Sequence, residues 1–131
     1  MYKIYDKNNN LIAIVNKFNK EVNSKNFLTA DEMSMQFAIF NLKKGDEIER
    51  HIHNKQKRVI FSTTEAITVL EGSMSIDLYD NNHEYLEKVL LEKHDSIVLY
   101  DGGHGLQMKE DCYFLEFKQG PYDEKSDKYH F

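Results

Sequence analysis

The apolar residues of this chain do not repeat at a helical spacing, which limits the possible folds more than any other feature. No stretch of about 12 residues keeps the 3.6-residue period of an amphipathic helix, and the chain has one proline, Pro121. Short segments rich in Val, Ile, Tyr and Phe are instead separated by clusters of Asn, Asp and Gly, which is typical of β-strands joined by turns. The sequence predicts an all-β fold with little or no helix. The expected strands are 2–5, 11–15, 35–42, 47–53, 58–61, 65–70, 73–79, 85–91, 96–100, 106–108 and 112–118.

These segments are expected to form a single domain. About ten short strands at close spacing favour a closed or sandwiched antiparallel fold, and 131 residues are enough to bury one core. We expect an N-terminal hairpin over residues 1–16, a barrel over about residues 33–118 and a polar surface tail over residues 119–131. Residues 16–32 are expected to be a polar loop with a short strand or turn inside.

Composition and charge argue against several classes of partner. Asp and Glu outnumber Lys and Arg by 22 to 17, for a formal net charge of −5, whereas phosphate binding needs a concentrated basic field. No apolar run approaches the roughly 18–20 residues of a membrane span, and the first residues do not have the pattern of a signal peptide. The single cysteine, Cys112, leaves no internal disulfide and is typical of a reducing compartment. We therefore expect a cytoplasmic protein that does not bind nucleic acid.

Two of the six histidines lie in the tripeptide His51-Ile52-His53. On a strand, residues two apart point to the same face, so the two imidazoles would lie side by side. Neutral imidazoles held together suit a divalent metal ion. The alternative is an exposed strand whose histidines are simply solvated.

Two more side chains could join such a site. Glu65 shares its expected strand face with Ile67 and Val69, where a carboxylate is costly unless it is paired or ligated. The alternative is that Glu65, at the start of its strand, still reaches water. His104 is flanked by glycines that let the backbone bend tightly. Three histidines and a glutamate form a mixed N/O donor set that suits Fe, Mn, Ni, Co or Zn and leaves coordination positions open.

The spacing of these residues resembles the two motifs of the cupin family. Residues 45–53 (G-x5-H-x-H) and 65–72 (E-x6-G) are similar to the first motif, and residues 93–104 (KHDSIVLYDGGH) are similar to the second. Eleven residues separate the second histidine from the glutamate, where the family usually has three or four. The resemblance covers about residues 35–118. It implies a small jelly-roll barrel that binds one divalent transition metal through His51, His53, Glu65 and His104.

A narrower resemblance lies in residues 100–105 (YDGGHG) and 118–122 (KQGPY). They are similar to segments of small cupins associated with surface-polysaccharide and sugar biosynthesis. This resemblance implies a context of carbohydrate biosynthesis. Together with the candidate metal site, this context favours a metal-dependent isomerase or epimerase that acts on an activated sugar or related polysaccharide precursor. The metal would polarise an oxygen of the substrate, and a nearby base would move a proton on the adjacent carbon.

Proton carriers and substrate contacts are expected near the second motif. Segment 112–118 has one apolar face, expected in the core, and one mixed face that either lines a binding cup or is solvated. Glu116, on the mixed face, is a candidate general acid or base. Tyr100 is a candidate donor to the substrate or a residue that packs at the barrel rim. His83 and His130 are expected to be exposed and receive no role. The residues assigned to substrate binding are Arg50, Arg58 and Lys118.

Two other functions remain open from the sequence. An Fe(II) site with open positions would suit an oxygenase or lyase. A cup, with or without metal, would suit a non-catalytic module that binds a small carbohydrate. The resemblance also implies a homodimer, and the N-terminal hairpin is the natural candidate to add at a neighbour's sheet edge.

Overall fold

The computed structural model describes residues 1–19 and 25–131. Within these residues the chain forms ten β-strands and no helix, which confirms the predicted all-β class. The described residues contain no helix that is long and apolar enough to span a membrane. The chain divides into a larger unit, Met1–Phe18 with Ser62–Phe131, and a smaller unit, Asn19–Phe61.

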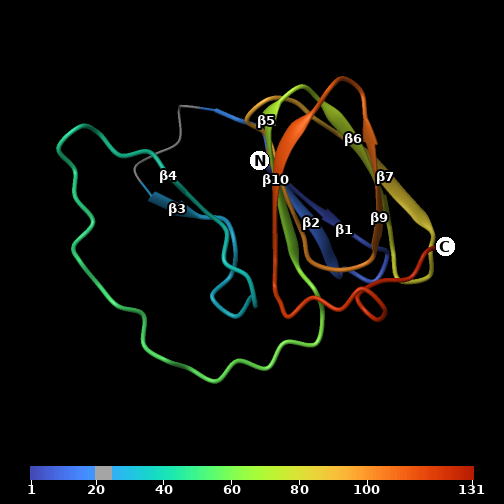
Figure 1. Cartoon of the computed structure of the whole chain (residues 1–131), viewed down its shortest axis with the longest axis horizontal. Helices are drawn as coiled ribbons and strands as arrows, with labels where there is room; N and C mark the ends of the chain where they lie inside the picture. Colours follow the sequence, from blue (N-terminus) through green and yellow to red (C-terminus); the bar gives the residue numbers. More distant parts are fainter. Residues whose placement is uncertain (20–24) are drawn as a thin grey trace. The chain divides into compact units, whose positions relative to one another are not determined.

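Two antiparallel sheets that face each other make up the larger unit (Figure 1). The first sheet has the order β1-β2-β8-β5-β10, and the second has the order β7-β6-β9. Neither sheet closes on itself among the described residues. The structure therefore shows two facing sheets, and the jelly-roll barrel stays a prediction. The strands are β1 (Tyr2–Tyr5), β2 (Leu11–Asn16), β5 (Glu65–Glu71), β6 (Met74–Tyr79), β7 (Tyr85–Leu91), β8 (Ser96–Leu99), β9 (Gly103–Met108) and β10 (Tyr113–Lys118).

One hydrophobic core fills the space between the two sheets. Alternate residues of β5 and β6 point inward, as the period of two in these segments predicts. Each fully buried aliphatic side chain contributes about 1.5–3 kcal/mol relative to an exposed one, so this core fixes the frame on which the site described below is built. Its members include Ile12, Val15, Ile67, Val69, Met74, Ile76, Leu78, Val89, Leu91, Ile97 and Leu99.

Strand β10 turns the opposite face inward from the one expected. Tyr113, Leu115 and Phe117 form its apolar face and are exposed, whereas Phe114 on the mixed face packs against the core. The alternation of a strand shows that two faces differ but does not show which one is covered. Here the charged members of the inward face are compensated by ion pairs, and the prediction that the apolar face lies in the core was wrong.

The smaller unit contains two short strands, β3 (Lys25–Phe27) and β4 (Ala38–Phe40), which pair antiparallel. β4 lies within the strand predicted at 35–42. The prediction of strands at 47–53 and 58–61 was wrong, since residues 41–64 form no strand. A strand persists only where its backbone N–H and C=O groups pair with a neighbour, and residues 41–63 are exposed throughout. Part of the loop predicted at 16–32, residues 20–24, lies outside the described residues.

Candidate functional site

A cavity of about 460 Å³ lies within the larger unit. Its volume falls in the range of about 300–1,000 Å³ that small-molecule sites occupy. Strands β5, β8, β9 and β10, the turn after β6 and the tail all contribute to its wall. Five carboxylates face only two lysines around it: Glu65, Asp80, Asp101, Glu116 and Asp127 against Lys118 and Lys128.

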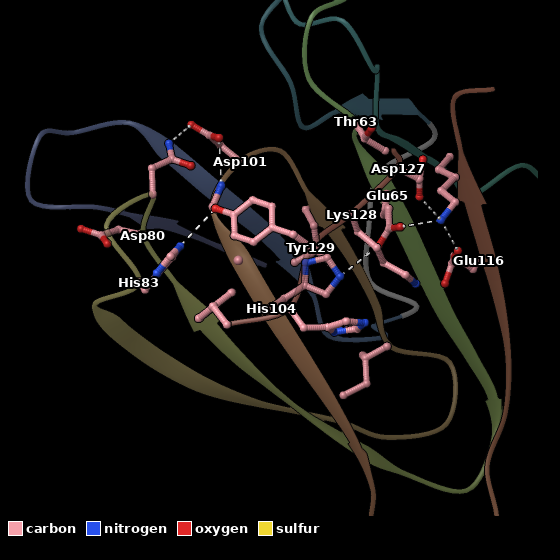
Figure 2. Close-up of a pocket in the computed structure, with 18 residues that line it drawn as sticks. Thr63, Glu65, Asp80, His83, Asp101, His104, Glu116, Asp127, Lys128 and Tyr129 are labelled. Atoms are coloured by element: carbon pink, nitrogen blue, oxygen red, sulfur yellow. Dashed lines mark hydrogen bonds and ion pairs between the residues drawn. The ribbon is translucent and has the colours of Figure 1, made fainter. Parts of the chain in front are cut away.

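Glu65 and His104 meet inside this cavity (Figure 2). The Nε2 atom of His104 lies 3.0 Å from Oε2 of Glu65, and the two side chains are 29% and 15% exposed. The hydrogen bond from His104 is the main reason that the pKa of Glu65 falls from 4.5 to about 2, against burial, which would raise it. The prediction that a carboxylate on this apolar face must be compensated fits this contact, since Ile67 and Val69 on the same face are fully buried.

Lys118 holds the other oxygen of Glu65. Its Nζ lies 3.1 Å from Oε1 of Glu65, and Glu116 and Asp127 each lie 3.4 Å from the same ammonium. Lys118 is opposite Glu65 in the register of β10 and β5, so the strand pairing itself brings the two charges together. The hydrogen bond to Glu65 raises the pKa of Lys118 above its ordinary value, and this lysine stays cationic at neutral pH.

A glycine turn positions His104. Gly102, just before β9, has a φ of +74°, a conformation that L side chains rarely adopt. A Cβ atom at Gly102 would also collide with the carbonyl oxygen of Tyr79. Any other residue would therefore push β9 away from β6, where His104 is paired with Leu78. The tight bend next to His104 is therefore made at Gly102, two residues earlier, where both the backbone angle and the space require glycine.

The far end of the cavity contains a histidine to which the sequence assigned no role. His83 has a φ of +66° in the turn after β6 and lines the cavity, as does His130. Its Nε2 lies 3.1 Å from the hydroxyl of Tyr129, and its ring stacks on Phe131. Asp80 stabilises this turn by accepting the backbone N–H groups of Asn82 and Glu84. The cluster DNNH signals a turn, but nothing in it signals that a distant segment packs on the histidine.

Two of the remaining predicted site residues belong to the larger unit and four to the smaller unit. Glu116 lines the cavity, whereas Tyr100 is 5% exposed and does not line it; burial raises the pKa of Tyr100 to about 12. Arg50, Arg58, His51 and His53 belong to the smaller unit. The rings of His51 and His53 lie 5.0 Å apart at 87°, and Nδ1 of His51 contacts the carbonyl oxygen of Glu49 at 2.9 Å.

The described residues supply only part of the predicted metal site. Residues 1–19 and 25–131 contain no group of three or more His, Cys, Asp or Glu side chains arranged to hold a metal ion. Glu65 and His104 provide two donors, and the ammonium of Lys118 already contacts Glu65. These two donors do not by themselves fit a metal ion. Completion of the set by His51 and His53 stays a prediction.

The arrangement can nevertheless carry out proton chemistry. A carboxylate that accepts a hydrogen bond from one ring nitrogen of a histidine fixes the ring and increases the basicity of the other nitrogen. A lysine that stays cationic can stabilise negative charge that develops on an oxygen.

The chain matches no protein-family model, no curated protein and no solved structure.

Proposed function

We propose that the protein is an isomerase or epimerase that moves a proton on a carbohydrate bound in the 460 Å³ cavity. The observation that carries this proposal is the contact of 3.0 Å between His104 and Glu65 in that cavity. Histidine is the side chain that most often acts as a general base near neutral pH, and a carboxylate bound to one of its ring nitrogens fixes the orientation of the ring. The resemblance to sugar-related cupins supports the same substrate class.

The proton step uses three side chains of the larger unit. Glu65 binds Nε2 of His104, so Nδ1 takes a proton from the carbon next to the carbonyl group of the sugar. The C–H electrons form a C=C bond, and the carbonyl π electrons move to oxygen, where the Lys118 ammonium stabilises the enediolate. Return of the proton to the opposite face of the same carbon gives an epimer. Return to the former carbonyl carbon, together with transfer of the hydroxyl proton of the neighbouring carbon to the former carbonyl oxygen, gives an isomer. The step is redox-neutral and needs no co-reactant.

Glu116 is the second proton carrier in this proposal. It lines the same cavity and its carboxylate is 37% exposed, so it can exchange protons with water between turnovers. Together with His104 it gives the cavity one imidazole and one carboxylate for proton transfer. Tyr100 is less suited to ionise because burial raises its pKa to about 12.

The charge of the cavity favours the neutral part of a substrate. Five lining carboxylates against two lysines leave an excess of three negative charges when the histidines are neutral. Carboxylates accept hydrogen bonds from sugar hydroxyl groups, whereas they repel phosphate. The sugar ring is therefore the part that we place in the cavity. Arg50 and Arg58, which the sequence assigned to substrate binding, belong to the smaller unit and do not line this cavity.

A divalent metal remains part of the proposal as a predicted cofactor. As an alternative to their contact with each other, Glu65 and His104 would be two of its ligands; when bound, the metal would act as a Lewis acid on a substrate oxygen. None of the proton steps above is routed through it.

The test is deuterium exchange in D2O. We expect NMR to show deuterium incorporation next to the carbonyl group of at least one compound in a panel of keto and aldo sugars and their nucleotide-activated forms. Substitution His104→Gln should lower the exchange rate by about 10²-fold or more, the usual contribution of a general base. Substitution His94→Gln is the matched control, because His94 does not line the cavity. No exchange with any member of the panel, or equal exchange in both variants, would contradict the proposal.

A further inference from the structure

The tail over residues 119–131, predicted to lie on the surface, also forms one wall of the cavity. Five consecutive residues, 127–131, line the cavity. Two of them, Tyr129 and Phe131, are nevertheless 74% and 60% exposed to solvent. Residues that face both the cavity and the solvent form a partition between the two, and Figure 2 labels Tyr129 of this segment among the residues that line the cavity with His104.

Among the described residues, the contacts that hold this wall are made by Asp127, Tyr129 and Phe131. At one end, Oδ2 of Asp127 lies 3.4 Å from Nζ of Lys118. At the other end, the Phe131 ring stacks on His83 at 4.2 Å and 12° and meets Tyr79 edge-on at 5.3 Å. The hydroxyl of Tyr129 adds one hydrogen-bond contact with His83. Segments with few buried apolar contacts open at low free energy.

The tail is anchored at its base, Gln119, and forms a compact turn over residues 123–127. Gln119 accepts the backbone N–H of Thr64 at 2.8 Å through its side-chain oxygen. Residues 123–127 form a turn in which the backbone N–H groups of Ser126 and Asp127 both donate to the carbonyl oxygen of Asp123. Movement of the wall would therefore leave the base in place and break the contacts of Asp127, Tyr129 and Phe131.

A glycine provides the seat for the Phe131 ring. A Cβ atom at Gly103 would lie 2.6 Å from Cζ of Phe131, far closer than two carbon atoms pack. The ring fits against β9 only because this position has no side chain. Gly105, two residues along the same strand, would place its Cβ in open space. Gly103 thus marks a specific seat for the aromatic ring.

We propose that residues 123–131 form a removable cover over the cavity, latched by the Phe131 ring on His83 and Gly103, and that its release admits the ligand. The cover regulates access to the site of the proposed function, so its biological use rests on that function. The latch itself rests only on the contacts of the tail. The ligand class that it would admit is the carbohydrate already proposed.

The experiment measures motion and access without any turnover. Hydrogen–deuterium exchange, followed by mass spectrometry on peptides from residues 123–131, compares the wild type with Gly103→Ala, Phe131→Ala and Gly105→Ala. We expect at least roughly threefold faster exchange in the first two variants, because one occupies the seat of the ring and the other removes the ring. Gly105→Ala is the matched control and should behave as the wild type. Phe131→Ala changes a largely exposed residue, so it tests the latch even if Gly103→Ala folds poorly.

The second measurement probes access to His104 with diethyl pyrocarbonate, which acylates imidazole nitrogens. The modification rate of His104, normalised to that of His94 outside the cavity, should rise at least roughly threefold in Phe131→Ala. Unchanged exchange of residues 123–131 in both Gly103→Ala and Phe131→Ala would overturn the latch. Faster exchange with unchanged modification of His104 would overturn the cover. Neither result depends on finding a substrate, so failure of this proposal is distinguishable from failure of the proposed function.

Discussion

Substitution of Glu65 by glutamine tests the ion-pair centre of the site most directly. The carboxylate contacts His104 at 3.0 Å and Lys118 at 3.1 Å through its two oxygens. Glutamine keeps the size and one acceptor oxygen but removes the charge. The variant therefore reports on the charge of Glu65 rather than on packing around it.

The magnitude follows from the pKa of this group. A pKa that falls from 4.5 unfolded to about 2 folded corresponds to about 3 kcal/mol of stability at neutral pH, since a tenfold change in proton affinity equals about 1.4 kcal/mol. Partial solvent access screens the interaction, so we expect Glu65→Gln to lose about 2–3 kcal/mol at pH 7. Because the folded pKa is the lower one, this stability is present above pH 4.5 and is lost as the pH falls through about 2.

Urea denaturation at pH 7 and pH 3, followed by far-UV circular dichroism, measures the effect. The difference between wild type and Glu65→Gln should shrink from about 2–3 kcal/mol at pH 7 to about 1 kcal/mol at pH 3. Other carboxylates titrate in both proteins and cancel. Glu116→Gln is the control, because Glu116 is 37% exposed and its contact with Lys118 is longer, at 3.4 Å; its substitution should cost less than about 1 kcal/mol at pH 7. A difference between wild type and Glu65→Gln that is the same at both pH values would refute the reasoning.

Two other predictions concern the frame of the site. Gly102→Ala should destabilise the protein by about 2–3 kcal/mol in thermal or urea unfolding, because it strains a positive φ and meets the Tyr79 carbonyl; Gly105→Ala should stay within about 0.5 kcal/mol of the wild type. Asp95→Asn should cost about 2–4 kcal/mol at pH 7, since the buried carboxylate accepts Lys17 Nζ at 2.7 Å and the backbone N–H groups of Phe18 and Glu92 at 2.9 Å. Burial opposes ionisation of Asp95, but these bonds prevail and lower its pKa. The loss should therefore diminish in denaturation curves as the pH falls below the ordinary carboxyl range, and a loss independent of pH would contradict this account.

The strands of the larger unit were predictable because each has a local signal. The β6 segment alternates Met74, Ile76 and Leu78 on one face, and these three residues are fully buried in the structure. The turn clusters between the segments fixed where the strands end. Such signals depend only on neighbours in the sequence, so one chain suffices to read them.

The strands missing from residues 41–64 illustrate the limit of the same method. Residues 47–53 and 58–61 have strand-like composition, yet a strand also needs a partner for its hydrogen bonds. Pairing is a property of the tertiary structure, and composition cannot supply it. The exposed side chains of Ile52 and Phe61, at 94% and 98%, show that apolar character alone did not place these residues in a sheet.

The residues of the site show the same limit: some could be predicted from the local sequence and others could not. Glu65 could be singled out because a carboxylate on an apolar strand face needs a partner, and the structure shows two partners. His83 could not be found, because its role depends on Tyr129 and Phe131, more than 40 residues later in the chain. Local spacing identifies a chemical need, whereas only the fold shows which distant residue meets it.

Lys118 provides a decisive test of the predicted metal, because the ammonium and a metal ion would compete for Glu65. Nζ lies 3.1 Å from Oε1, and the ammonium would repel a second cation bound to the same carboxylate. If Glu65 is a metal ligand, Lys118→Met should tighten Zn²⁺ or Mn²⁺ binding at least about tenfold in isothermal titration calorimetry. The exposed Lys109→Met is the control and should bind the metal as the wild type does. Equal affinity in all three proteins would remove Glu65 from the metal site and leave it as the partner that orients His104.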